Sequence, residues 1–164
     1  MSFTQFKTDF LQRSAKLVDK WSEESYVDPP PVIIVPDESL DPFEVGPIYV
    51  RSGWKHSSIP GPAIIFPEHY LSDLYEKASQ TNDIRKLWQV LDWGLAHELG
   101  HHVRVFGEVT KLVNETSASL YAFSFTGRTR RKHNELFTEI MGENPSEYVT
   151  RKLREQRQIV RCPS

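Results

Sequence analysis

Apolar residues recur at helical spacing along the first part of the chain. They are Phe3, Phe6, Phe10, Leu11, Leu17, Val18 and Trp21. This spacing predicts an amphipathic helix over residues 3–22. The helix cannot continue through the prolines at 29–31, because proline lacks a backbone N–H and disfavours helical geometry in the residue before it.

Short runs of β-branched residues between prolines and glycines follow as far as Pro67. Such residues fit extended, half-buried backbone, so we expect three strands. The strands cover Val32–Val35, Pro47–Arg51 and Ala63–Phe66. The stretch from 51 to 61 then forms a loop or a hairpin connection.

Helical spacing returns after Pro67. The expected helices span residues 69–79, about 82–106, about 109–125 and, from the capping residue Asn144, about 144–160. Gly107 is expected to end the long helix over about 82–106. Together the patterns predict one α+β domain over residues 1–164. Residues 1–68 hold the N-terminal helix and the strands, and residues 69–164 are mainly helical.

Composition narrows the functional classes. The chain has 164 residues, a hydrophobic fraction of 38% and a net charge of −2, which is ordinary for a globular protein and does not favour a nucleic-acid partner. Its single cysteine, Cys162, cannot form an internal disulfide framework. Neither a signal peptide nor an apolar run long enough to span a membrane is evident. We therefore expect a cytoplasmic protein.

The long helix carries the clearest chemical motif, His97-Glu98-Leu99-Gly100-His101. Residues four apart lie on one helix face, so the imidazoles of His97 and His101 can reach one zinc ion. Glu98 lies beside that face, where its carboxylate can take a proton from a zinc-bound water and pass it to a leaving amine. The small residues Ala96 and Gly100 would let another element or a substrate approach.

This segment resembles the active-site helix of the zincin metallopeptidases. Metzincins carry a third histidine six positions after the second, where this chain has Gly107, so that branch is excluded. Peptide deformylases have a similar helix but need a cysteine ligand upstream of it. The only cysteine here, Cys162, lies downstream, so that branch is excluded as well.

The helix that follows adds a second resemblance. Glu115, Ala118, Ala122 and Phe123 match the pattern of the ImmA/IrrE-type metallopeptidases, small gluzincin-like proteins associated with cleavage of repressors. The resemblance covers about residues 84–126 and implies Glu115 as the third zinc ligand. It also implies a zincin-like fold, in which a short mixed sheet packs on the active-site helix and the glutamate-ligand helix. Alanines after the ligand would let the two helices pack closely.

Several details stay open at this stage. Many gluzincins have an acidic residue at the position of Ser119, so another partner for the first histidine is needed, and Asp92 is a weak candidate. His133, Tyr148, Tyr121 and Arg128 are candidates for stabilising the oxyanion. His56, His69 and His102 are expected to be structural or surface residues. Ala63–Phe66 is the candidate sheet edge for pairing with a peptide, with a fully paired core strand as the alternative.

The function expected from these features is zinc-dependent hydrolysis of peptide bonds in an intracellular protein, with Glu98 as the base. The substrate would be a protein or peptide, with a regulatory protein as the target that the resemblance suggests. One alternative is a zinc-containing binding module that uses the same pocket for a protein partner. Another is a latent enzyme whose basic C-terminal helix, or Cys162, occupies the site. A third alternative is a SprT-like protease, in which His133 replaces Glu115 as ligand.

Overall fold

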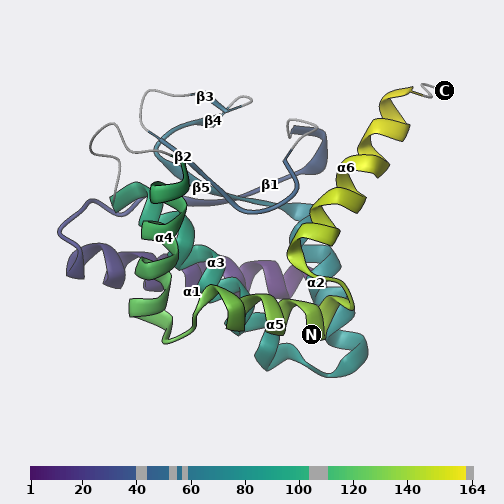
Figure 1. The fold of residues 1–164 in the computed structure, drawn as a ribbon, viewed down its shortest axis with the longest axis horizontal. Helices are drawn as coiled ribbons and strands as arrows, with labels where there is room; N and C mark the ends of the chain where they lie inside the picture. The colour runs from purple at the N-terminus through teal and green to yellow at the C-terminus, as the bar shows by residue number, and fades with distance from the viewer. Residues whose placement is uncertain (40–43, 52–54, 57–58, 104–110, 162–164) are drawn as a thin grey trace.

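The computed structural model describes residues 1–39, 44–51, 55–56, 59–103 and 111–161. Within them it has an α+β architecture, with a small mixed sheet on one side of a group of helices (Figure 1). The helices are α1 (Phe3–Glu24), α2 (Glu68–Thr81), α3 (Ile84–Val103), α4 (Lys111–Thr126), α5 (Arg130–Met141) and α6 (Pro145–Arg161). The strands are β1 (Val32–Val35), β2 (Ile48–Val50), β3 (Lys55–His56), β4 (Ile59–Pro60) and β5 (Ala63–Pro67), and a short 3-10 turn covers Asp37–Ser39.

The first helix confirms the periodicity argument. The Ser2 hydroxyl accepts a hydrogen bond from the Gln5 backbone N–H at 3.1 Å, which satisfies one of the unpaired N–H groups at the helix start. Phe6, Phe10 and Val18 are buried on one face. The helix extends two residues beyond the predicted end at 22.

The three-stranded sheet has the order β1-β5-β2, with β1 parallel and β2 antiparallel to β5. The central strand β5 is buried along its whole length. The proposal that Ala63–Phe66 forms the sheet edge is therefore wrong, and the alternative of a paired core strand holds. The edge strands are β1, which contacts α1, and β2, which contacts α3. The connection from 51 to 61 contains the β3–β4 hairpin.

The predicted helices of the second half are present, while the predicted end of α3 near Phe106 and its stop at Gly107 lie outside the described residues. Sequence analysis missed α5. Its signals are the Thr129 cap, whose hydroxyl accepts from the Lys132 N–H at 3.2 Å, and Gly142 at the C-terminal end with a φ of 73°. The buried residues of α5 have helical spacing: His133, Leu136, Phe137 and Ile140.

Helix α3 is the centre of the packing. It contacts α1, α2, α4, α5 and the sheet (Figure 1). The apolar stripe that the helical spacing predicts is buried at four positions, Leu87, Leu91, Leu95 and Leu99. It is partly buried at the other three, Ile84, Trp88 and Val103. No helix in the described ranges has the length and apolarity that a membrane crossing requires.

Helices α3 and α4 approach most closely at Gly100. A Cβ added to Gly100 would lie 2.9 Å from the Ala118 Cα and 3.1 Å from the Tyr121 Cβ. Both contacts are with groups close to the α4 backbone, so a side chain at this position would force the helices apart. The expectation that small residues allow close helix packing is confirmed.

We predict that Gly100→Ala lowers the free energy of unfolding by about 1–3 kcal/mol, the usual cost of overpacking a tight contact. Gly94→Ala is the matched control in the same helix, because the nearest atom to its added Cβ is the Pro47 Cγ at 3.8 Å, an ordinary contact. There the lower backbone entropy of alanine should raise stability by about 0.5–1 kcal/mol. Urea unfolding measures both values, and equal effects would contradict the packing described here.

Candidate metal centre

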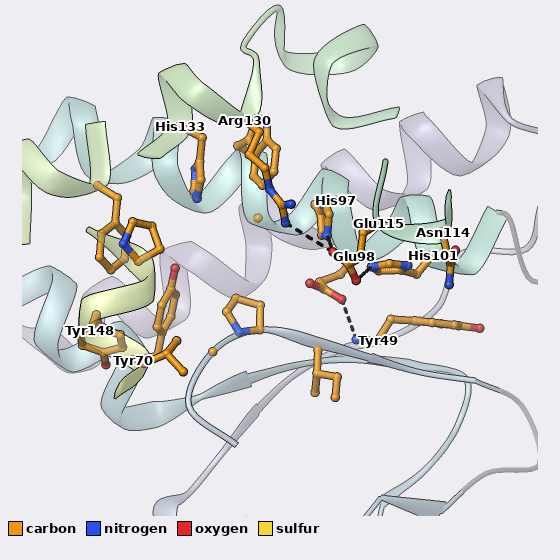
Figure 2. A pocket seen from close by; sticks show the side chains of 18 of the residues that line it. Tyr49, Tyr70, His97, Glu98, His101, Asn114, Glu115, Arg130, His133 and Tyr148 are labelled. Atoms are coloured by element: carbon orange, nitrogen blue, oxygen red, sulfur yellow. Dashed lines mark hydrogen bonds and ion pairs between the residues drawn. The ribbon is translucent and has the colours of Figure 1, made fainter. Parts of the chain in front are cut away.

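Two consecutive helices bring three metal-binding side chains together. His97 and His101 come from α3, and Glu115 comes from the second turn of α4 (Figure 2). The His97 Nε2 lies 3.2 Å from Glu115 Oε2, and the His101 Nε2 lies 3.2 Å from Glu115 Oε1. The ligand atoms of the three residues lie within 4.8 Å of one another, so the group could hold a metal ion.

The charge state of the group suits a cation. Hydrogen bonds from His101 and His97 hold the pKa of Glu115 well below its usual range, so the carboxylate is ionised. Burial lowers the pKa of His97, which favours the neutral imidazole that metals bind. Burial also acts against the charged form of His101, but the hydrogen bond with Glu115 and the charge of Glu98 raise its pKa overall.

The orientation of His97 is supported from α4. Its Nδ1 lies 3.4 Å from the Ser119 hydroxyl, so the position that lacks the expected carboxylate still supplies a polar neighbour. Asp92, the weak candidate for that role, is instead bound by Arg13 of α1 through two hydrogen bonds of 2.9 and 2.6 Å.

Glu98 lies between the metal-binding group and the sheet edge (Figure 2). Its Oε2 accepts a 2.8 Å hydrogen bond from the backbone N–H of Tyr49 on β2. The residue keeps some exposure, but its carboxyl is surrounded by protein, and burial raises the pKa of Glu98 to about 7. The group can therefore take up and release a proton near neutral pH.

A side-chain bridge fixes Tyr49 against the same helix. The His102 Nε2 lies 2.8 Å from the Asp28 carbonyl oxygen, which can only accept, so this nitrogen carries the proton. His102 Nδ1 then accepts from the Tyr49 hydroxyl at 2.9 Å. His102 therefore has a structural role, because its two hydrogen bonds connect α3 to β2 and to the segment after α1. His69 pairs with Asp37, as a structural residue would, and the side chain of His56 lies outside the described residues.

The metal-binding group opens into a pocket of about 760 Å³. Its metal end holds His97, Glu98, His101, Asn114 and Glu115. One wall comes from the sheet edge and consists of Gly46, Pro47, Ile48, Tyr49 and Arg51. Its aromatic end is lined by Tyr70, Trp93, His133, Phe137 and Tyr148. Arg130 lies above the metal end, with its Nη2 3.4 Å from Glu115 Oε2 (Figure 2).

The oxyanion candidates differ in their surroundings. The Tyr121 hydroxyl lies 2.7 Å from the Ser25 hydroxyl and also donates to the Trp21 carbonyl, so it faces α1. The Tyr148 hydroxyl donates to Asp73 at 2.9 Å. The Arg128 guanidinium donates to the Thr126 carbonyl at 3.0 Å.

Only His133 of the four turns its polar atoms toward the pocket, and an indole separates it from the metal-binding group (Figure 2). Trp93 stacks on the His97 ring with centroids 5.1 Å apart and on the His133 ring at 4.2 Å. The Trp93 Nε1 donates to the Arg128 carbonyl at 2.9 Å, which fixes the indole. His133 is consequently not part of the group that could hold a metal.

Comparisons with known proteins add no relative. No family model, curated protein or solved structure matches the chain. The evidence for a function therefore comes from the side chains that line this pocket. Sequence reasoning missed Tyr49, Tyr70, Trp93 and Arg130 there, and only Trp93, four residues before His97, carries a local signal.

We predict that each chain binds one transition-metal ion and that Glu115→Ala weakens this binding by more than about 100-fold. A lost outer-shell partner typically costs 10- to 100-fold, and a ligand should cost more. His133→Ala should retain the metal, because Trp93 separates its ring from the group. Mass spectrometry of the purified wild type and both variants measures their metal content. Loss of the metal in His133→Ala alone would favour the SprT-like alternative.

Proposed function

We propose that this protein is a zinc-dependent metallopeptidase that hydrolyses internal peptide bonds of a protein or peptide. The observation that carries the proposal is the position of Glu98, whose carboxylate lies beside the His97, His101 and Glu115 group and inside the same pocket. A purely structural metal site has no use for a fourth, proton-accepting group. The resemblance of residues 84–126 to the ImmA/IrrE-type metallopeptidases agrees with this proposal.

The spacing of the ligand atoms supports zinc. With metal–ligand bonds of about 2.0–2.1 Å, the edge of a tetrahedron is about 3.3 Å. The His97 Nε2 lies 3.2 Å from Glu115 Oε2 and the His101 Nε2 lies 3.2 Å from Glu115 Oε1, so either carboxylate oxygen can form such an edge with one imidazole. Two imidazoles and one carboxylate are also a donor set of catalytic zinc sites, which leave the fourth position open.

When bound, zinc supplies a Lewis acid that makes a water molecule more acidic. Glu98 accepts the proton of that water and later donates it to the leaving amine, for which a pKa near 7 is well suited. The Tyr49 N–H holds one carboxylate oxygen in place and leaves the other free. Arg130 provides a positive charge above the metal end, where it can stabilise the oxyanion.

Among the described strands β2 is an edge of the sheet, and its side away from β5 is the proposed site for the substrate backbone. The Tyr49 N–H is directed at Glu98 and not at β5, so this side of β2 faces the pocket. An extended peptide lying beside β2 would pass directly in front of Glu98. The substrate edge is therefore β2 instead of the predicted Ala63–Phe66.

The latent-enzyme alternative gains no support from α6. Pro145, Tyr148 and Val149 of its first turns line the aromatic end of the pocket, and the helix then projects away from the fold (Figure 1). Cys162 lies outside the described residues.

We predict that Glu98→Gln keeps its zinc but cleaves peptides about 10²- to 10⁴-fold more slowly, because the amide cannot act as the base. Glu135→Gln, a change of the same type on the exposed face of α5, should leave cleavage unchanged. Each protein is incubated with a random peptide mixture, and mass spectrometry of the products over time gives the cleavage rate. The zinc content is measured in the same samples. Full cleavage by Glu98→Gln would refute its assigned role. A zinc-loaded wild type that binds peptides without cleaving them would support the binding-module alternative.

A further inference from the structure

Two polar side chains in the aromatic end of the pocket have no role in the proposed chemistry. Tyr70 of α2 and His133 of α5 are only 7% and 8% exposed, and both line the pocket. The Nδ1 of His133 is buried and has no hydrogen-bond partner within the described ranges. Tyr70 contributes its hydroxyl to the lining of the same pocket. Figure 2 shows the two side chains pointing toward the same space from opposite sides.

Buried polar groups normally have a hydrogen-bond partner, and leaving one without a partner costs about 1–3 kcal/mol. The unpartnered imidazole of His133, with the Tyr70 hydroxyl facing the same space, therefore points to a ligand that completes it. Burial lowers the pKa of His133 to about 3, so its ring is neutral, and burial raises the pKa of the Tyr70 hydroxyl, which stays protonated. Between them they can donate a hydrogen bond and accept one.

The walls of this space are aromatic and held in place. Tyr70, Phe137 and Tyr148 contact one another, with ring centroids 5.7–6.4 Å apart. The Tyr148 hydroxyl is bound by Asp73, so this residue presents its ring and not its hydroxyl to the space. Flat aromatic walls suit a flat apolar body.

The charges nearby select against a charged occupant. Among the described residues that line the pocket, the only carboxylates are Glu98 and Glu115, and both belong to the metal end. The aromatic end thus has no counter-ion for a lysine or arginine. The Arg130 guanidinium also lines the pocket, but Glu115 holds it at the metal end, so a carboxylate at the aromatic end would lose its hydration beside a neutral imidazole and a phenol.

The position of the space relates it to the scissile bond. Trp93 stacks on the His97 ring and on the His133 ring. The Tyr70–His133 space is therefore joined to the metal-binding group through Trp93, within the same pocket. A peptide whose scissile bond is at the metal end would place a neighbouring side chain there.

We propose that the aromatic end is a specificity site for a tyrosine side chain next to the scissile bond. The tyrosine ring packs against Phe137 and Tyr148, and its hydroxyl bonds with both Tyr70 and His133. This inference rests on the proposed function, because it places the peptide by means of the metal.

Amino-acid hydroxamates test the site without needing turnover, since they bind zinc through the hydroxamate group. On the zinc-loaded full-length protein, tyrosine hydroxamate should bind at least about tenfold more tightly than phenylalanine hydroxamate, the difference expected for one satisfied buried hydroxyl. Calorimetry measures both affinities. Equal affinities in the wild type would overturn the proposal.

Tyr70→Phe should remove most of this preference while the zinc content and the affinity for phenylalanine hydroxamate stay the same. Tyr75→Phe is the matched control on the same helix, because the Tyr75 hydroxyl bonds to the Met1 carbonyl outside the pocket. A preference that survives in Tyr70→Phe, or that is lost equally in both variants, would contradict the assigned contacts.

Failure of the proposed function has a different signature. A wild type without zinc would refute the metallopeptidase and would bind neither hydroxamate. N-acetyl-tyrosinamide and N-acetyl-phenylalaninamide, which need no metal, then decide the specificity site by NMR titration. Preference for the tyrosine compound would retain the site, and equal binding would overturn it.

Discussion

The contact between Gly100 and Ala118 is the constraint on which the metal centre depends. It lets α4 approach α3 so closely that Glu115 reaches both imidazoles, although 14 residues separate it from His101. A carboxylate side chain is short, so even a small separation of the helices would break one of the two 3.2 Å contacts. The glycine within the motif therefore acts through packing and has no chemical role of its own.

A second link joins this helix pair to the sheet. Tyr49 contacts α3 twice, through its N–H to Glu98 and through its hydroxyl to His102. Glu98 and the edge strand thus share one residue. Under the proposed function, a peptide aligned on β2 would also be aligned on Glu98, which would couple substrate placement to proton transfer. On the other side, Trp93 lies between the metal end and the aromatic end of the pocket, so the proposed chemistry and the proposed recognition would use different parts of it.

Much of this arrangement follows from local sequence patterns. Helical spacing predicts α1 and α3, and the four-residue spacing of His97 and His101 places them on one face. The sheet order could not be predicted, because β1 and β5 pair across about 30 residues and short apolar strands look alike whether central or at an edge. Helix α5 is difficult to predict because it begins with Arg130, Arg131 and Lys132, and the apolar helical spacing starts only at Leu136. Tyr49 and Tyr70 enter the site only through tertiary contacts.

The central claim, a metal held by two imidazoles and the Glu115 carboxylate, is tested most directly by X-ray absorption spectroscopy of the zinc-loaded protein. The account predicts four nitrogen or oxygen neighbours at about 2.0–2.2 Å, with the multiple-scattering signal of two imidazoles. Glu115→Ala should change this first shell. A sulfur neighbour at about 2.3 Å would place Cys162 on the metal, and a third imidazole would implicate another histidine, and either result would contradict the account.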